Sequence, residues 1–241
     1  MTVAEARAQY SAILLGATGN VGGRIVQLLI RNPRCKKVMV VTRRKTDAFA
    51  DPKVSQLIVN MDRLQEEVAP HAQGVDVAIA AFGVGKGSAK MPEEQVRKIE
   101  IAYPRAFCRA AKDGGARVCG LMTAVGADPE SRMRYAKIIG EKEKAVESIK
   151  FDLLGIYRPA VILGNSNTPG ALGYVVPLLH WAMPSKYHSI HKNDLARAMV
   201  AQSEQAFFAI EQDGGPEEAT VKILEYKEME PFFVKGERDE P

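Results

Sequence analysis

Three glycines near the N-terminus have the spacing of a turn that binds phosphate groups. Gly16, Gly19 and Gly22 follow the apolar run 13–15 and precede a segment with helical apolar periodicity. Gly16 permits a sharp exit from a strand, Gly19 removes a side chain where backbone approaches a diphosphate, and Gly22 lets the helix pack closely. The helix N-terminus would then bind the diphosphate, although a glycine-rich turn in another kind of α/β protein is the alternative. The expected cofactor contacts in this turn are Gly16, Thr18, Gly19, Asn20, Val21 and Gly22.

A basic run after the second apolar segment predicts which dinucleotide is bound. Thr42 is followed by Arg43, Arg44 and Lys45, with no acidic residue to bond to a ribose 2′-hydroxyl, as NAD-binding folds usually have. A guanidinium binds phosphate through two parallel hydrogen bonds, whereas a carboxylate would repel a 2′-phosphate. We therefore expect NADP rather than NAD, bound by Arg43 and Arg44, and a solvated basic turn is the alternative.

The same region raises a nucleic-acid hypothesis, because basic residues are dense between positions 34 and 45. They are Arg34, Lys36, Lys37, Arg43, Arg44 and Lys45. No aromatic residue is interleaved with them to stack on bases, which disfavours RNA or DNA binding.

Strands and helices alternate in the order typical of a doubly wound α/β fold. The predicted strands cover residues 12–15, 37–42, 56–60, 76–81, 117–122 and 152–157, with a late strand within 220–229. The predicted helices cover 21–31, 63–68, 92–113 with a kink at Pro104, 131–148 and 195–205, and Asp62 and Asp194 are expected to cap two of them. We expect one Rossmann-type parallel sheet over residues 1–241, with segments 165–190 and 206–241 forming a small cap or edge.

The composition limits the class and the compartment of the protein. The chain has 241 residues, of which 46% are hydrophobic, and a formal net charge of +4 that does not by itself require a polyanionic partner. No run of about 18 apolar residues is present, so no membrane span is expected. The segment 1–10 lacks the apolar core of a secretory signal. The three cysteines and four histidines show no metal-ligand spacing, so no metal site is expected. The odd number of cysteines predicts reduced thiols in a reducing compartment, which favours a cytoplasmic location, with an organelle as the alternative.

Across about residues 12–205 the chain resembles the Tat-interacting-protein-like oxidoreductases, atypical short-chain dehydrogenase/reductases near the NmrA-like group. The segments that carry the resemblance are GATGNVG at 16–22, VTRRK at 41–45, GLMTAVGAD at 120–128, the helix from Tyr135 through Gly140 and Glu141, and YRPAVILG at 157–164. The resemblance implies that Asp62 faces the adenine. The glycines after residue 81 would bring the backbone close to the ribose and diphosphate of the cofactor, with a plain flexible loop as the alternative. The further contacts that we expect are Phe82, Gly83, Val84 and Pro159.

The resemblance also implies three catalytic groups, of which this chain supplies two. A tyrosine exchanges a proton with the substrate oxygen, a serine or threonine positions the carbonyl, and a lysine four residues after the tyrosine lowers its pKa. Tyr135 and Thr123 match the first two groups. Position 139 carries Ile139, which has neither a charge nor a donor, and Lys142 is two helical turns from Tyr135. We therefore expect Tyr135 to be a poor acid or base at neutral pH, or simply a packing residue.

Two main functional hypotheses follow. The first is an NADP-binding protein with a degenerate catalytic site that senses its cofactor or binds a protein partner. The second is an active NADP-dependent reductase of a small carbonyl substrate, using Tyr135 with a displaced cation or a water relay. An RNA-associated protein that uses segment 34–45 is disfavoured. The apolar stretch 171–183 is expected to cover the substrate, with an oligomer contact or a membrane-surface helix as alternatives.

Overall fold

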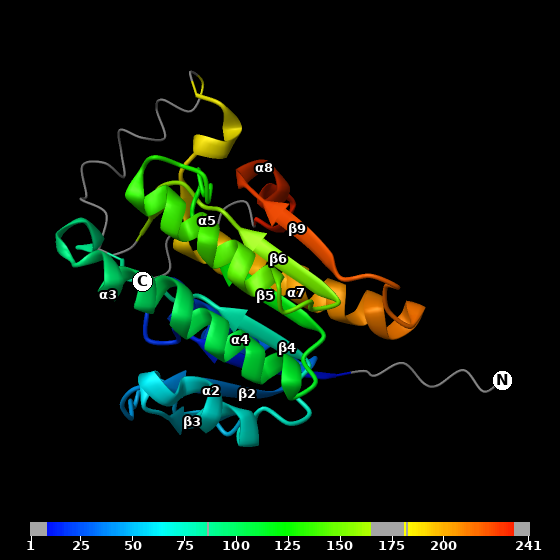
Figure 1. The fold of residues 1–241 in the computed structure, drawn as a ribbon. Coiled ribbons are helices and arrows are strands. Elements are labelled where there is room, and N and C mark those ends of the chain that lie inside the picture. The colour runs from blue at the N-terminus through cyan, green and yellow to red at the C-terminus, as the bar shows by residue number, and fades with distance from the viewer. Residues whose placement is uncertain (1–8, 86, 165–180, 182, 234–241) are drawn as a thin grey trace.

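Seven parallel strands form one sheet in the computed structural model, which describes residues 9–85, 87–164, 181 and 183–233 (Figure 1). The strands are β1 (Tyr10–Leu15), β2 (Cys35–Thr42), β3 (Val54–Ile58), β4 (Val77–Ala80), β5 (Val118–Met122), β6 (Leu153–Tyr157) and β9 (Thr220–Leu224). Their spatial order is β3-β2-β1-β4-β5-β6-β9, so the chain reverses direction across the sheet between β1 and β4. This order confirms the predicted doubly wound fold.

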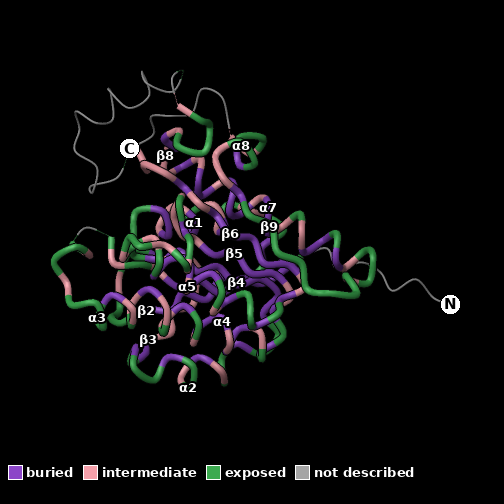
Figure 2. The backbone as a smooth tube through the Cα atoms, turned by 45° about the horizontal axis from the view of Figure 1, so that its top comes forward, coloured by how far each residue is buried: buried purple, intermediate pink, exposed green. Residues whose placement is uncertain are grey.

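Helices cover both faces of the sheet. On one face lie α1 (Asn20–Arg31) and α7 (Lys192–Asp213), and on the other lie α2 (Leu64–Val68), α4 (Tyr103–Asp113) and α5 (Arg134–Glu147). Along β1, Ala12 and Leu14 join the core beneath α1 and α7, whereas Ile13 and Leu15 join the core beneath α4. The central strands are therefore apolar on both faces, and Figure 2 shows them buried between partly exposed helices.

Several predicted strand boundaries need correction. β1 begins at Tyr10 and β2 at Cys35, two residues earlier than predicted, because the Tyr10 N–H already donates to the Arg34 carbonyl. β3 ends at Ile58 because the next residues turn into a helical segment. The predicted late strand ends at Leu224, since Glu225 and Glu228 form a capping box that starts α8 (Tyr226–Met229).

The predicted single helix over 92–113 is three helical segments. α3 (Glu93–Arg97) leads into a π-helical turn at Lys98–Ala102, which continues as α4. At the junction the Tyr103 N–H donates to the Lys98 carbonyl, one residue further back than in an α-helix. Pro104 follows and has no N–H to donate, so the wider turn absorbs the break that the sequence predicts as a kink.

Three other helix predictions are partly wrong. α5 begins at Arg134 rather than at residue 131, because residues 128–133 form turns. α7 is longer than the predicted 195–205, and its cap is the His191 side chain, which accepts from the Asn193 N–H, rather than Asp194. Asp62 caps nothing, because the cap before it is Asn60, whose side chain accepts the Asp62 N–H at 3.0 Å.

The first segment of the predicted cap, residues 165–190, lies mostly outside the described residues. Of this segment, residues 165–180 and 182 are not described; β7 (Ile162–Leu163) and β8 (Ile190–His191), at its two ends, pair as a short parallel ribbon. No described helix has both the length and the apolar character that crossing a membrane requires.

A charge network joins four elements at one end of the sheet. Asp152, just before β6, accepts from Arg117 at 2.7 Å and from Lys112 of α4 at 3.0 Å. Arg117 also pairs with Glu211 of α7 at 3.0 Å. Burial opposes ionisation of Asp152, but the hydrogen bonds from Arg117 and Lys112 outweigh it and lower the pKa of that carboxyl.

Candidate dinucleotide site

The glycine turn connects β1 to α1, and two of its glycines are required by the fold alone. Gly16 has a φ of +97°, and a Cβ there would lie 2.2 Å from the Ala81 carbonyl oxygen. A Cβ at Gly22 would lie 2.0 Å from the Gly16 carbonyl oxygen, so Gly22 is required by the turn itself rather than by packing on the sheet. A Cβ at Gly19 would meet only that same oxygen, at 3.3 Å, so the fold tolerates a side chain there.

The N-terminus of α1 is arranged to receive an anion. Its N-cap, Gly19, makes no side-chain cap hydrogen bond, and no acidic residue lies in the first turn to offset the helix dipole. Thr18, Gly19 and Asn20 are exposed. The missing Cβ at Gly19 leaves the approach to this terminus open, so a diphosphate fits the residues present.

The end of β2 offers cations and an unsatisfied hydroxyl. Arg43 and Arg44 are exposed, and neither forms an ion pair with any other described residue. The Thr42 hydroxyl is buried, with 6% of the residue exposed, and it has no hydrogen-bond partner in the described part of the chain. The two exposed guanidinium groups are able to bind an anionic group at this end of β2.

A cleft of about 550 Å³ lies beside the glycine turn, at the carboxyl ends of the strands. Its wall combines the glycine turn, the loop after β4, the end of β5, one side of α5 and the segment after β6. The predicted site residues that line it are Gly19, Asn20, Val21, Phe82, Gly83, Val84, Thr123, Tyr135 and Pro159. The predicted residues that do not line it are Gly16, Thr18, Gly22, Arg43, Arg44 and Asp62.

Asp62 lines a different cavity, of about 540 Å³, beside α2 and α4. Its Oδ1 accepts from the Tyr103 hydroxyl and from Lys98 Nζ, each at 2.7 Å. These hydrogen bonds, from Lys98 first and then Tyr103, lower the pKa of the Asp62 carboxyl. The proposed contact of Asp62 with adenine therefore stays a prediction.

Tyr135 and Ile139 stand on the side of α5 that lines the cleft. Ile139 is buried, with 1% exposed, so the position expected to hold the lysine presents an aliphatic wall. Tyr135 keeps 45% of its surface exposed, but desolvation by the surrounding protein, and then the negative charge of Glu100, raise its pKa to about 12. Tyr135 is consequently a weaker acid than a tyrosine in water.

A buried ion pair lies under the same cleft, and the sequence reasoning did not find it. Lys142 and Glu100 are each 2% exposed, and Lys142 Nζ lies 3.1 Å from Glu100 Oε2. Lys142 Nζ also donates to the Phe82 carbonyl at 2.9 Å, and Glu100 Oε1 accepts the Val84 N–H at 2.8 Å. The side of the helix on which Lys142 lies could be predicted, because seven residues are nearly two full helical turns and place Lys142 on the same side as Tyr135. The direction of Glu100 could not be predicted in this way, because it lies in the π-helical turn.

Thr123 is held by a second network behind the cleft. Its hydroxyl lies 2.8 Å from Glu143 Oε1 and 3.2 Å from the Tyr157 carbonyl, and it can donate its single hydrogen to one of them. Arg158 donates to both oxygens of the Glu143 carboxylate. The Thr123 hydroxyl therefore donates to Glu143 or to the Tyr157 carbonyl rather than into the cleft. A role of Thr123 in positioning a substrate carbonyl stays a prediction.

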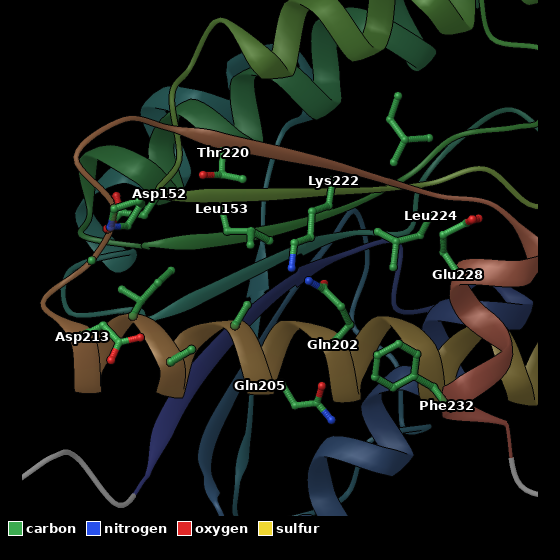
Figure 3. Close-up of a pocket in the computed structure, with 16 residues that line it drawn as sticks. Asp152, Leu153, Gln202, Gln205, Asp213, Thr220, Lys222, Leu224, Glu228 and Phe232 are labelled. Atoms are coloured by element: carbon green, nitrogen blue, oxygen red, sulfur yellow. The ribbon is translucent and has the colours of Figure 1, made fainter.

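A larger cavity, of about 820 Å³, lies away from all of these residues. It opens between α7 and the edge strand β9, and Figure 3 shows Gln202 and Lys222 directed into it from opposite sides. Gln202 Oε1 accepts the Tyr157 hydroxyl at 2.6 Å. None of the predicted site residues lines this cavity, so size alone does not identify the functional site.

The basic segment 34–45 does not form one surface. Its two basic groups flank β2, one at each end, and an eight-residue strand spans roughly 26 Å. Arg34 is also engaged within the protein, with its guanidinium 3.3 Å above the ring of Phe208 and 3.4 Å from Glu204. This separation weakens the nucleic-acid hypothesis. In the described part of the chain, no group of three or more His, Cys, Asp or Glu side chains could hold a metal ion.

Comparisons with known proteins agree with this geometry. The family model described as NAD(P)H-binding matches residues 16–206. Protein FMP52, mitochondrial, from Candida albicans is 32% identical over 165 residues, covering 68% of this chain and 72% of that protein. Protein HTATIP2 from Rattus norvegicus is 32% identical over 188 residues, covering 70% and 76%. The Bordetella bronchiseptica enzyme WbmH, in a complex with NAD+, is 15% identical with a TM-score of 0.60, covering 90% of this chain and 85% of WbmH.

Proposed function

The chain belongs to the NAD(P)H-binding family, with FMP52 and HTATIP2 among its relatives, and we propose that it binds NADP(H) but reduces carbonyl compounds slowly or not at all. Its resemblance to the Tat-interacting-protein-like reductases is confirmed. On this proposal the protein acts as a cofactor sensor or as an interaction module. The observation that carries the proposal is Ile139, which forms an aliphatic wall of the cleft at the position expected to hold the lysine, and the raised pKa of Tyr135 agrees with it.

The chain's own residues explain binding. The N-terminus of α1 would hold the diphosphate, because Gly19 leaves that terminus open and no acidic residue lies in the first turn. Arg43 and Arg44 would hold the 2′-phosphate. Each charge-assisted hydrogen bond to an anion contributes about 1.5–3 kcal/mol, so these arginines favour NADP over NAD.

Slow chemistry follows from the residues around Tyr135. A bound reduced dinucleotide supplies hydride to a carbonyl carbon, and the protein must supply a proton to the carbonyl oxygen to complete the alcohol. Tyr135 is a poor donor at a pKa of about 12, and Ile139 gives it no cation. Proton transfer by a positioned acid contributes about 10²–10⁴-fold to rates, and this chain would forgo much of that.

Two measurements test the proposal. Calorimetric titration should give NADPH an affinity higher than that of NADH by about 1–3 kcal/mol, and Arg43→Ala should remove most of that preference. Equal affinities would refute the cofactor assignment. NADPH oxidation should then be followed against a panel of aldehydes, ketones and quinones for the wild type, Tyr135→Phe and Ile139→Lys. Slow turnover that rises in Ile139→Lys is the expected result.

The second candidate function is an active NADP-dependent reductase of a small carbonyl substrate. The observation that favours it is Lys142, a cation in the wall of the same cleft as Tyr135. Brisk wild-type turnover that Tyr135→Phe abolishes would establish this candidate and refute the first. In both cases the residues that we propose for the chemistry are Tyr135 and Thr123.

The compartment is a separate proposal. The sequence predicts the cytoplasm, whereas the fungal relatives are named as mitochondrial proteins. A fluorescent fusion of the full chain, observed beside mitochondrial and cytoplasmic markers, distinguishes the two locations.

A further inference from the structure

We propose that Glu100 is a positioning residue. It holds the ammonium of Lys142 in an ion pair, so that Lys142 does not act on Tyr135 and Tyr135 remains a poor proton donor. The inference deepens the proposed function, on which it rests, because it names the residue responsible for the poor acidity. Of the described residues that line the cleft, Lys142 is the one cation and Glu100 the one acid. Their pairing decides the electrostatic field that Tyr135 experiences.

The ammonium of Lys142 is engaged by Glu100 and by the backbone at Phe82. It makes the 3.1 Å ion pair with Glu100 and the 2.9 Å hydrogen bond to the Phe82 carbonyl, and the side chain is 2% exposed. A carboxylate next to an ammonium cancels most of its field at a third site. The lysine therefore contributes little positive potential to the cleft, although it stands on the same helix as Tyr135.

Glu100 is itself fixed in place. Its Oε1 accepts the Val84 N–H at 2.8 Å, and it fills the space beneath Gly83, where a Cβ would lie 2.8 Å from the same oxygen. The π-helical turn at Lys98–Ala102 carries Glu100 into this buried position. Glu100 thus holds the loop after β4 and the ammonium of Lys142 with one carboxylate.

Among the described residues, Glu100 and Lys142 are the charged groups that line the cleft together with Tyr135. The other ion pairs between α5 and segment 93–102 join Arg97 to Glu141 and Arg134 to Glu93 and lie at the outer edge, and Lys98 pairs with Asp62. Behind α5, Glu143 is engaged by Arg158 and Thr123. Glu100 also contributes its own negative charge, which adds to desolvation in raising the pKa of Tyr135.

The test is a titration of Tyr135 in the cofactor-free protein. The protein is labelled with fluorotyrosine, whose ring fluorine moves phenol ionisation to milder pH, and the Tyr135 signal is assigned as the ¹⁹F resonance lost in Tyr135→Phe. Glu100→Gln should lower the Tyr135 pKa by about 1 unit or more, because it removes a like charge and releases the cation. Glu141→Gln, which removes an acid from the outer edge of the same interface, should leave that pKa unchanged.

A double variant separates the lysine from the carboxylate. Glu100→Gln with Lys142→Met lacks both charges, so the Tyr135 pKa should lie between those of the wild type and Glu100→Gln. An unchanged pKa in Glu100→Gln, or equal pKa values in the single and double variants, would overturn the inference. Backbone amide spectra confirm that each labelled variant is folded. If Glu100→Gln unfolds, the double variant, which has no unpaired buried charge, can still be compared with the wild type, and its Tyr135 pKa should be the lower of the two. The titration of Tyr135 uses cofactor-free protein, so its outcome does not depend on NADPH binding. A wild-type protein that fails to bind NADPH would refute the proposed function and leave the titration result unaffected.

Discussion

Replacing Gly19 by alanine separates the demands of cofactor binding from those of the fold. Gly19 has φ −82° and ψ 168°, which alanine adopts readily, and its added Cβ would lie 3.3 Å from the Gly16 carbonyl oxygen. A neighbour at that distance must move by a few tenths of an ångström. We therefore expect the free energy of unfolding to change by no more than about 1 kcal/mol, since the small steric cost and the poorer N-cap oppose the entropy gained from losing a glycine.

The same methyl group should strongly reduce the affinity for the dinucleotide. It would project where the diphosphate must approach the N-terminus of α1, and it would displace one or two charge-assisted hydrogen bonds. At about 1.5–3 kcal/mol for each bond, the dissociation constant for NADPH should rise by about 10–100-fold or more. Calorimetric titration measures the affinity, and urea denaturation of the same sample measures the stability.

Two neighbouring glycines supply matched controls. Gly23 lies inside α1, where an added Cβ would meet the Ala17 carbonyl at an ordinary 3.4 Å, so Gly23→Ala should keep the affinity and gain up to about 1 kcal/mol of stability. Gly22→Ala would place a Cβ 2.0 Å from the Gly16 carbonyl oxygen, so it should lose about 1–3 kcal/mol of stability or more. Wild-type NADPH affinity in a folded Gly19→Ala protein would refute the assignment of the diphosphate to this turn.

Three further predictions concern polar side chains with partners inside the protein, each measured by urea denaturation. Asp152→Asn should cost about 1 kcal/mol at pH 7 and progressively less as the pH falls below the ordinary aspartate pKa, because a carboxyl with a lowered folded-state pKa stabilises above its unfolded pKa and loses that effect as the pH falls through the folded one; a cost independent of pH would contradict it. Lys142→Met alone should cost about 3–5 kcal/mol by stranding the buried Glu100, and adding Glu100→Gln should recover part of the loss; a double variant no more stable than the single one would count against this. Tyr157→Phe should cost about 1–3 kcal/mol, because the buried oxygen of Gln202 loses its donor, and a neutral effect would show that the hydrogen bond is dispensable.

Local patterns were sufficient to predict the fold and to propose the glycine turn as the place where a cofactor binds. Strand-to-helix alternation and apolar runs predict the doubly wound sheet, because a strand covered on both faces must be apolar throughout. The turn at Gly16 and Gly19 was also readable, because backbone geometry around a phosphate depends on residues next to one another in the chain. The sequence likewise predicts that Ile139 shares a helix face with Tyr135, because residues four apart in one helix lie on the same side.

Only the tertiary structure decided which charged groups meet in the cleft. Glu100 and Lys142 come from different helical segments, and the π-helical turn shifts the register that would have predicted the direction of Glu100. Asp62 was likewise assigned a helix cap from its position in the sequence, yet its carboxylate binds Tyr103 and Lys98. Sequence determines which side chains share an element, because that spacing is covalent. Which elements bring opposite charges together depends on packing, and in this cleft packing pairs Lys142 with Glu100.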